Sequence, residues 1–246
     1  MRLETLLKIL IGVLLIGTLI ASAALLRFVF AGGKGTTPRT ELERAVVAAE
    51  QAVAANPNDP DARIKLAAAY FESGSPSAAV QQAQVAVRLE PNKPDPYYML
   101  GIAQAKMGQN QAALGNLNKS IALKGQTAAF YEDVYVQLSH VLEATGDKKG
   151  ALAAIGKAID SDPENVLLLV ERGGIYERDS QWYLAAVDYG WAVRFSPDYQ
   201  PGVTALLNIN KAHPVEAKKA AARVVLDFQG DQAPGLNTSP TTTSTP

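Results

Sequence analysis

The feature that most constrains the fold of this chain is a fixed interval between positions that break helices. Pro57 and Pro91 lie 34 residues apart, as do Pro91 and Gly125, and again Pro163 and Pro197. A period of this length is typical of solenoids, in which each repeat buries its apolar face only against its neighbours. The interval therefore predicts a series of stacked units that offers an extended binding surface.

Within each interval the residue pattern predicts two helices joined by a short turn. The segment from Asn56 to Pro60 ends one helix and starts the next, because proline disfavours helix in the residue before it and Asp59 supplies a capping oxygen. A second turn is expected at Gly74–Ser77. Around it, apolar residues recur at helical spacing. In this unit they are Leu66, Ala67, Tyr70, Ala79, Ala83 and Ala86.

Four successive units share this arrangement, over residues 60–93, 94–127, 132–165 and 166–199, with a short insertion at 128–131. Their shared residues are large or small at fixed places: Tyr97, Leu100, Gly101, Gly108, Ala113, Leu117 and Ser120 in the second unit; Tyr135, Leu138, Gly146, Ala151, Ile155, Ala158 and Pro163 in the third; Gly173, Tyr176, Trp182, Ala185, Tyr189, Ala192 and Pro197 in the fourth. In this register the chain resembles the tetratricopeptide repeat (TPR) family. Gly125 replaces the closing proline of the second unit. Arg172 stands where leucine is usual, which is expected to weaken packing there.

The resemblance implies an all-α fold, a right-handed helical-repeat solenoid of the TPR type. Residues 41–59 are expected to form a lone second helix of a half-repeat, and residues 200–228 a pair of capping helices. Lys218, Lys219 and Arg223 suit the polar outer face that a terminal repeat needs. The Thr-, Ser- and Pro-rich tail, 229–246, lacks an apolar face and is expected to be disordered.

The amino-terminal segment predicts a single transmembrane helix, an anchor within residues 1–31 that contacts the membrane through residues 6–30. No charged residue occurs from Ile9 to Leu26, and this stretch would rise roughly 27 Å as a helix, close to the hydrocarbon thickness. The alternative is a cleaved signal peptide, with a cleavage site near Ala21-Ser22-Ala23. The positive start and short tail favour an extracytoplasmic repeat domain, although the positive charges on the two sides are nearly balanced. Residues 32–40 are expected to form a flexible linker, and Gly35 breaks the residue order that a phosphate-binding loop requires.

Composition excludes several kinds of chemistry. The formal net charge of -1 gives no basic excess for nucleic acid, and the absence of cysteine excludes disulfides and thiolate metal sites. Only His140 and His213 are available, so neither a metal site nor a cofactor site is expected. His140 could act as a base beside Glu143, but without a nucleophile or oxyanion donors this is no catalytic set. The chain is therefore expected to be no enzyme and to have no small-molecule substrate.

By the resemblance, the first helices of the repeats line a groove that binds a peptide or helix of a partner protein. The groove residues would be Lys65, Ala68, Phe71, Tyr98, Met99, Ile102, Gln137, His140, Glu143, Glu171 and Glu177. Tyr98, Met99 and Phe71 are the strongest candidates for interface energy. Family members that bind the carboxyl tails of heat-shock chaperones carry Lys, Asn and Arg in the groove. Ile64, Ala68, Met99 and Gln137 stand there instead, so such tails are not expected as partners.

These observations favour a membrane-anchored scaffold that recruits proteins to the bilayer. The alternative is an extracytoplasmic holdase chaperone, and the resemblance extends to anchored proteins of protein translocation, cytochrome c maturation and envelope assembly. The spacing of Gly17 and Ala21 also permits anchor helices to pair, so self-association stays open.

Overall fold

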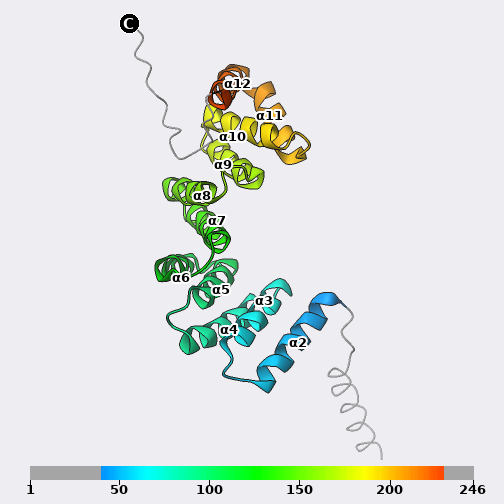
Figure 1. Ribbon diagram of the computed structural model, residues 1–246, viewed down its shortest axis with the longest axis vertical. Helices are drawn as coiled ribbons and strands as arrows, with labels where there is room; N and C mark the ends of the chain where they lie inside the picture. Colours follow the sequence, from blue (N-terminus) through cyan, green and yellow to red (C-terminus); the bar gives the residue numbers. More distant parts are fainter. Residues whose placement is uncertain (1–39, 230–246) are drawn as a thin grey trace, which may run out of the picture. The chain divides into compact units, whose positions relative to one another are not determined.

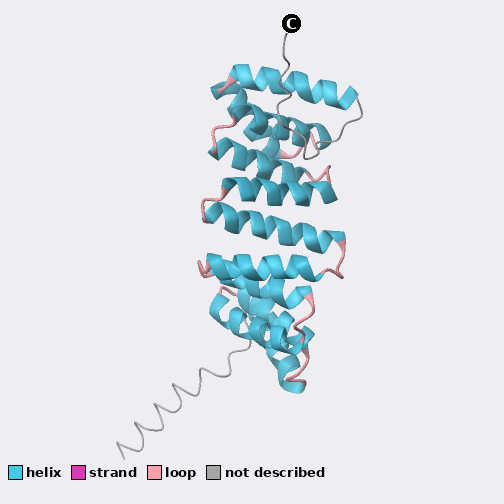
Figure 2. Ribbon diagram, turned by 90° about the vertical axis from the view of Figure 1, so that its left-hand side faces the viewer, coloured by secondary structure: helices cyan, strands magenta, loops and turns pink. Residues whose placement is uncertain are grey.

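The computed structural model describes residues 40–229, which form eleven helices and no strand (Figures 1 and 2). The helices are α2 (Glu41–Ala55), α3 (Pro60–Glu72), α4 (Pro76–Leu89), α5 (Pro94–Lys106), α6 (Asn110–Leu123), α7 (Ala128–Ala144), α8 (Lys148–Ser161), α9 (Val166–Arg178), α10 (Trp182–Phe195), α11 (Gln200–Ala212) and α12 (Pro214–Gln229). The predicted membrane segment, its signal-peptide alternative, most of the linker and nearly all of the tail lie outside the described residues. Among the helices of residues 40–229, none has both the length and the hydropathy to cross a bilayer.

The chain divides into two compact units, residues 1–48 and 49–246, and the second holds the helix pairs. Each pair packs internally, α3 on α4, α5 on α6, α7 on α8 and α9 on α10. Each pair also contacts the next through α4 and α5, α6 and α7, α8 and α9, and α10 and α11. The prediction of an all-helical solenoid, in which each unit packs on its neighbours, is confirmed.

Three-residue turns join the two helices of the first four pairs. Each turn holds one residue at positive φ, glycine at 74, 108 and 146 and Ser180 in the fourth turn. A backbone hydrogen bond then closes the end of the first helix, as from Gln109 N to Gln104 O at 2.9 Å. This is the usual way in which a left-handed residue satisfies the last carbonyl groups of a helix.

Small residues let the two helices of a pair approach closely. A Cβ atom on Gly101 would lie 2.9 Å from the Leu117 side chain, and one on Gly173 would meet the ring of Tyr189. Ala67 and Ser139 occupy the same place in the other two pairs, and both are fully buried. Only a residue without a long side chain fits at this place in the repeat.

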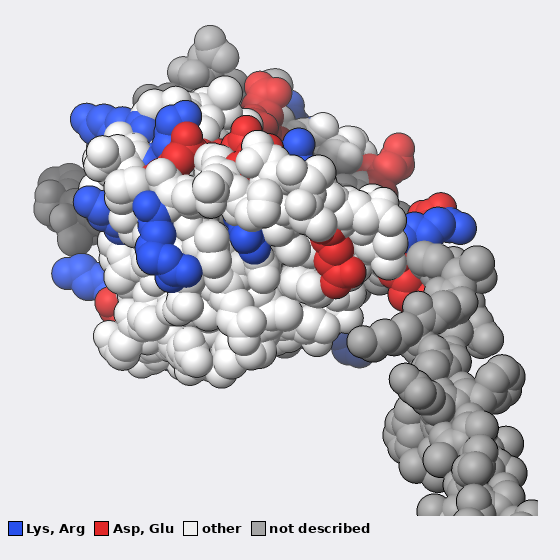
Figure 3. Space-filling view, turned by 90° about the horizontal axis from the view of Figure 1, so that it is seen from below, with Lys and Arg blue, Asp and Glu red and all other residues white. Residues whose placement is uncertain are grey.

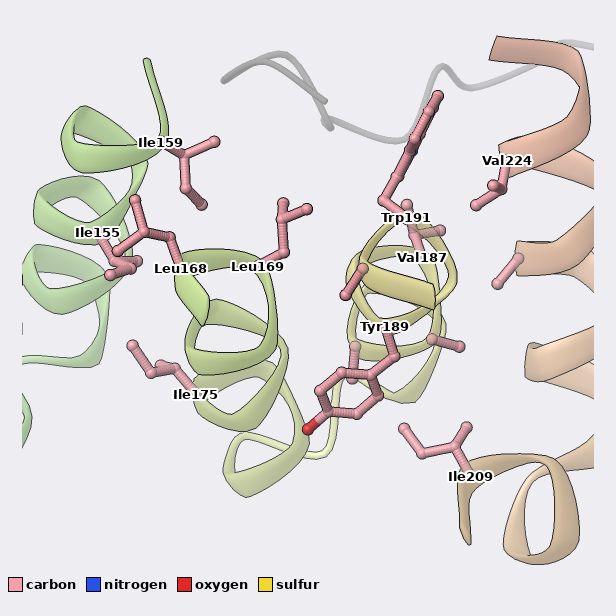
Figure 4. Close-up of a cluster of buried hydrophobic side chains, with 14 of the residues drawn as sticks. Ile155, Ile159, Leu168, Leu169, Ile175, Val187, Tyr189, Trp191, Ile209 and Val224 are labelled. Carbon is pink, nitrogen blue, oxygen red and sulfur yellow. The ribbon is translucent and has the colours of Figure 1, made fainter. Parts of the chain in front are cut away.

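The core is a series of clusters rather than one centre. Around α9, apolar side chains from five successive helices, α8 to α12, converge in a single cluster (Figure 4). Ile155 comes from α8, Leu169 from α9, Tyr189 from α10, Ile209 from α11 and Val224 from α12. Similar clusters join α3, α4 and α5, and α6, α7 and α8. Each helix is therefore stabilised mainly by its neighbours in sequence.

Arg172, which stands where leucine is usual, is buried in an ion pair. Its guanidinium donates two hydrogen bonds to Asp188 of α10, at 2.8 and 2.7 Å, and the two side chains are only 3% and 1% exposed. A buried cation is tolerated when a carboxylate pairs with it in this two-fold geometry. The partner lies on the next helix, so position 172 alone did not indicate the pair.

Candidate protein-binding face

The first helices of the repeats follow one another in a row, and we name α3, α5, α7 and α9 the first-helix row. Helix α3 contacts α5, and α5 contacts α7. Two side-chain pairs, His140 with Glu171 and Glu143 with Arg178, join α7 to α9. Every residue predicted to line a binding groove lies on these four helices. The side chains of this row fall into two groups, one apolar and aromatic and the other charged.

The part of the row nearer the amino terminus carries apolar and aromatic side chains that remain partly exposed. We name Ala68, Phe71, Tyr98, Ile102 and Phe130 the aromatic segment. The rings of Tyr98 and Phe130 pack edge to face with centroids 5.4 Å apart. Ile102 packs against both neighbouring core clusters, so it joins the α3 and α7 sides of the segment.

The environment of Tyr98 is largely apolar. Its partial burial, together with the nearby charge of Asp133, raises the pKa of the Tyr98 phenol to about 12. The hydroxyl therefore stays neutral at physiological pH. On the same helices, the predicted groove residue Lys65 is exposed, as are Glu72 and Lys106. Charges of both signs thus accompany the apolar side chains of this part of the row.

Met99 does not contribute to this surface. Its side chain is 5% exposed and packs in the cluster of Ala67, Ala83 and Leu100. Successive residues of a helix point about 100° apart, so the neighbour of a surface tyrosine can face the core. The prediction of Met99 as a partner contact is corrected accordingly.

In the part of the row on α7 and α9, the polar side chains bind one another or a residue of α10. We name His140, Glu143, Glu171, Glu177 and Arg178 the ion-pair segment. Arg178 donates to both carboxylate oxygens of Glu143, at 2.5 and 2.9 Å. His140 Nε2 bonds the Glu171 carboxylate, and the Tyr189 hydroxyl donates to Glu177 Oε2 at 2.8 Å. Gln137 is half-buried on the same stretch of α7.

The hydrogen bond with Glu171 raises the pKa of His140, and the charges of Glu171 and Glu143 add to this effect. Burial and Arg178 act in the opposite direction. The histidine is thus engaged with Glu171 on the next repeat, and not with Glu143 as an isolated acid–base pair. Among residues 40–229, no group of three His, Asp or Glu side chains is arranged to hold a metal ion.

Sequence reasoning missed Phe130 and Arg178. Phe130 comes from the insertion at 128–131, which forms the first turn of α7 and makes that helix 17 residues long. The Thr127 side chain caps this turn by accepting from Phe130 N. The signal for this was the interval between Gly101 and Ser139, which exceeds the repeat period. Arg178 gave no signal beyond its place one turn after Gly174.

Part of the surface carries no charged side chains (Figure 3). On the face drawn in Figure 3, Lys and Arg side chains lie mostly to one side and Asp and Glu side chains to the other, with a broad uncharged area between and below them. A surface of this kind suits protein partners better than a polyanion, which needs a continuous basic face.

The chain matches two models of known protein families. The family model described as tetratricopeptide repeat matches residues 132–165, and the model described as anaphase-promoting complex, cyclosome, subunit 3 matches residues 39–120. No curated protein matches the chain in a sequence comparison.

Several solved structures share the fold. The MamA protein is 26% identical over 64% of this chain and 84% of its own, with a TM-score of 0.55. YrrB, described as a TPR protein with an unusual peptide-binding site, is 16% identical over 76% and 95%, with a TM-score of 0.55. PilF of Pseudomonas aeruginosa is 15% identical over 83% and 87%, with a TM-score of 0.58. The last two are similar in fold alone.

Proposed function

Because this chain is a tetratricopeptide repeat protein, we propose that it is an adaptor that binds a partner protein through the aromatic segment of its first-helix row. TPR folds mediate protein–protein interactions, and YrrB is described as having a peptide-binding site. Neither fact identifies a site here. The proposal therefore depends on the side chains of this chain.

The observation that carries the proposal is the contrast along the row. The polar side chains of the ion-pair segment bind one another across α7 and α9, so a partner would have to break those bonds to use them. The aromatic segment has partly exposed apolar side chains whose burial by a partner would be favourable. Aromatic residues supply much of the energy of protein interfaces.

The chemistry of the segment suggests the form of the partner. Phe71, Tyr98 and Ile102 offer apolar contacts across two neighbouring helices, which suits an amphipathic helix or an extended peptide with a few apolar anchors. Lys65 and Lys106 would favour carboxylates beside those anchors, and Glu72 would favour a basic residue. We therefore propose a short motif with apolar anchors and charged neighbours as the ligand.

The proposal includes a membrane anchor at residues 6–30, which is supported by the apolar run from Ile9 to Leu26. It places the repeats outside the cytoplasm, which the positive start and short amino-terminal tail favour. Recruitment at the bilayer would follow from that anchor. A holdase would need a broad apolar face for many clients. Ion pairs occupy the α7–α9 part of the row, which favours a selective adaptor.

Affinity capture from detergent extracts tests the function. The full-length chain should retain a few discrete partners, and the double variant Phe71→Ala, Tyr98→Ala should lose them. Ile102→Ala is a second variant that removes an apolar contact of the segment without removing a packed ring. Met107→Ala, an exposed apolar side chain in the turn after α5, is the matched control. If both segment variants still captured the partner proteins, the proposal would be contradicted. Capture of many unfolded chains would favour the holdase.

A further inference from the structure

The link from α6 to α7 lacks two backbone hydrogen bonds that the comparable links between repeats have in common. After α4, α8 and α10, the first link residue donates its N–H to the carbonyl four residues earlier, as from Glu90 to Ala86 at 2.9 Å. The residue three positions later then donates to the carbonyl of that first residue, as from Lys93 to Glu90 at 3.3 Å. Residues 124–127, all of which the structure describes, form neither bond. These bonds therefore do not fix the direction of α7 relative to α6.

The backbone of this link also differs in conformation. Lys124 has φ 52° and ψ −179°, in a region that residues with a Cβ atom rarely adopt, and Gly125 follows with φ 98°. A change of conformation at Lys124 would relieve this strain. At the place of Gly125 the other three links have Pro91, Pro163 and Pro197, and the ring of proline fixes φ at about −65°. The chain is thus less restrained at this link than at the other three.

The helix pairs on the two sides of the link are joined mainly by apolar contacts. Further along the solenoid, polar bonds between side chains fasten α7 and α8 to α9 and to the turn after it. They join His140 to Glu171, Glu143 to Arg178, and Lys148 to Asp179. Among the described residues, no such bond joins α5 or α6 to α7 or α8. Leu117 and Val134 share a core cluster there, and Gln126 of the link donates to Asp95 at 2.5 Å. Apolar contact is non-directional, so it holds the pairs together without fixing the angle between them.

The aromatic segment lies across this link. Tyr98 and Ile102 belong to α5, whereas Phe130 belongs to the first turn of α7, three residues after Thr127. The rings of Tyr98 and Phe130 pack edge to face, with centroids 5.4 Å apart, and Phe130 packs in the same way on Tyr131. A rotation of α7 about the link would change the distance between the Tyr98 and Phe130 rings. Their contact therefore favours one angle between the two helix pairs.

We propose that the α6–α7 link is a joint, about which residues 128–199 move relative to residues 60–123, and that the contact of Tyr98 with Phe130 is its latch. The few link residues absorb the change of backbone conformation, as in hinges generally. This motion does not depend on any partner. One consequence rests on the proposed function: a partner that covers both rings binds the latched form better, so its binding holds the joint at one angle.

Pairs of spin labels on equivalent positions test the joint. The chain has no cysteine, so two introduced cysteines can be labelled without background. Gln81, Gly115 and Ala153 occupy the same place in α4, α6 and α8, and all three are exposed. A Cβ atom on Gly115 meets no atom within 4 Å. The pair Gly115→Cys, Ala153→Cys spans the joint, and the pair Gln81→Cys, Gly115→Cys spans the α4–α5 link as the matched control.

Pulsed dipolar spectroscopy of the full-length protein in detergent should give a wider distribution of distances for the 115–153 pair than for the 81–115 pair. Phe130→Ala should widen the 115–153 distribution further and leave the 81–115 distribution as it was. Met107→Ala, an exposed side chain in the turn after α5, should change neither. Circular dichroism checks that all variants keep their helices.

The other outcomes each contradict a part of the proposal. Two distributions of equal width would mean that the α6–α7 link is as rigid as the others. A wide 115–153 distribution that Phe130→Ala leaves unchanged, or a variant that widens both distributions alike, would show that Phe130 is no latch. In the complex isolated by affinity capture, the 115–153 distribution should be narrower than in the free protein, and an equal width would overturn the effect of the partner. Failure to capture any partner would count against the proposed function, whereas the comparison in the free protein would still decide on the joint.

Discussion

The two parts of the first-helix row have the same fold and opposite chemistry. On α3, α5 and the first turn of α7 the row presents partly exposed apolar side chains, whereas further along α7 and on α9 its polar side chains are engaged with one another or with α10. Beneath the second part, Arg172 and Asp188 add a buried ion pair between α9 and α10. A solenoid can therefore use one stretch of a continuous surface for binding and another for holding its own repeats together.

The largest expected effect concerns the buried pair. Arg172→Met leaves the Asp188 carboxylate buried without its partner, which should lower the free energy of unfolding by about 3–5 kcal/mol. Urea denaturation followed by circular dichroism measures this. The double variant Arg172→Met, Asp188→Leu should recover most of the loss, because no charge then remains buried. A single variant as stable as the unaltered protein would contradict the stabilising role given to the pair.

A methyl group added where the two helices of a pair approach closely should cost more stability in the ion-pair part of the row than in the aromatic part. Gly173→Ala would drive a methyl group into the Tyr189 ring, whose hydroxyl is held by Glu177, and should cost about 2–3 kcal/mol. Gly101→Ala meets the more flexible Leu117 side chain and should cost about 1 kcal/mol or less. Thermal denaturation of both variants gives the comparison. Equal losses of stability would mean that the α5–α6 and α9–α10 pairs accommodate the methyl group equally well.

The pH dependence of the α7–α9 contact should be small and of definite sign. Because the hydrogen bond with Glu171 raises the pKa of His140 in the folded protein above its ordinary value of 6.5, protonated His140 stabilises the fold. This contribution is fully present below pH 6.5 and is lost as the pH rises through the folded pKa. His140 is about half exposed, so the contribution should stay below about 1 kcal/mol.

Stability measured from pH 5 to 9 for the unaltered protein and for His140→Gln isolates that contribution. The difference between them should shrink with rising pH. A difference that grows with pH would reverse the assignment.

The smallest expected effect is the loss of the Glu143–Arg178 pair. Both side chains retain access to solvent, so Glu143→Gln should cost about 0.5 kcal/mol and the effect should fade in high salt. Partner capture should not change, because this pair lies outside the aromatic segment. Loss of capture in this variant would move the binding site toward α9.

Sequence reasoning reached the repeats more readily than the site. The 34-residue interval and the small residues at fixed places predicted the helical solenoid because those residues act locally, between adjacent helices. The pairing of Arg172 with Asp188, and of His140 with Glu171, depends on which residues of different helices face each other. A helical pattern gives the side of a helix, but it does not give the partner across the contact. Met99 and Tyr98 show that even the side can be wrong by one residue.

The last pair shows a different limit. Lys218 and Lys219 predicted a polar cap, and both are exposed, but so is Val215 beside them. In this pair Leu207 stands where the other pairs have a small residue, and His213 alone links α11 to α12. Both features could have been predicted from the 34-residue register of the repeats.

The most direct test of the account places a photo-crosslinking amino acid at Ala68 or at Gly174 in the full-length protein. These two positions occupy the same place in the first and fourth repeats, one in the aromatic part of the row and one in the ion-pair part. The account predicts a discrete crosslinked partner from position 68 and none from position 174. A crosslink from position 174 as strong as that from position 68, or from 174 alone, would contradict it.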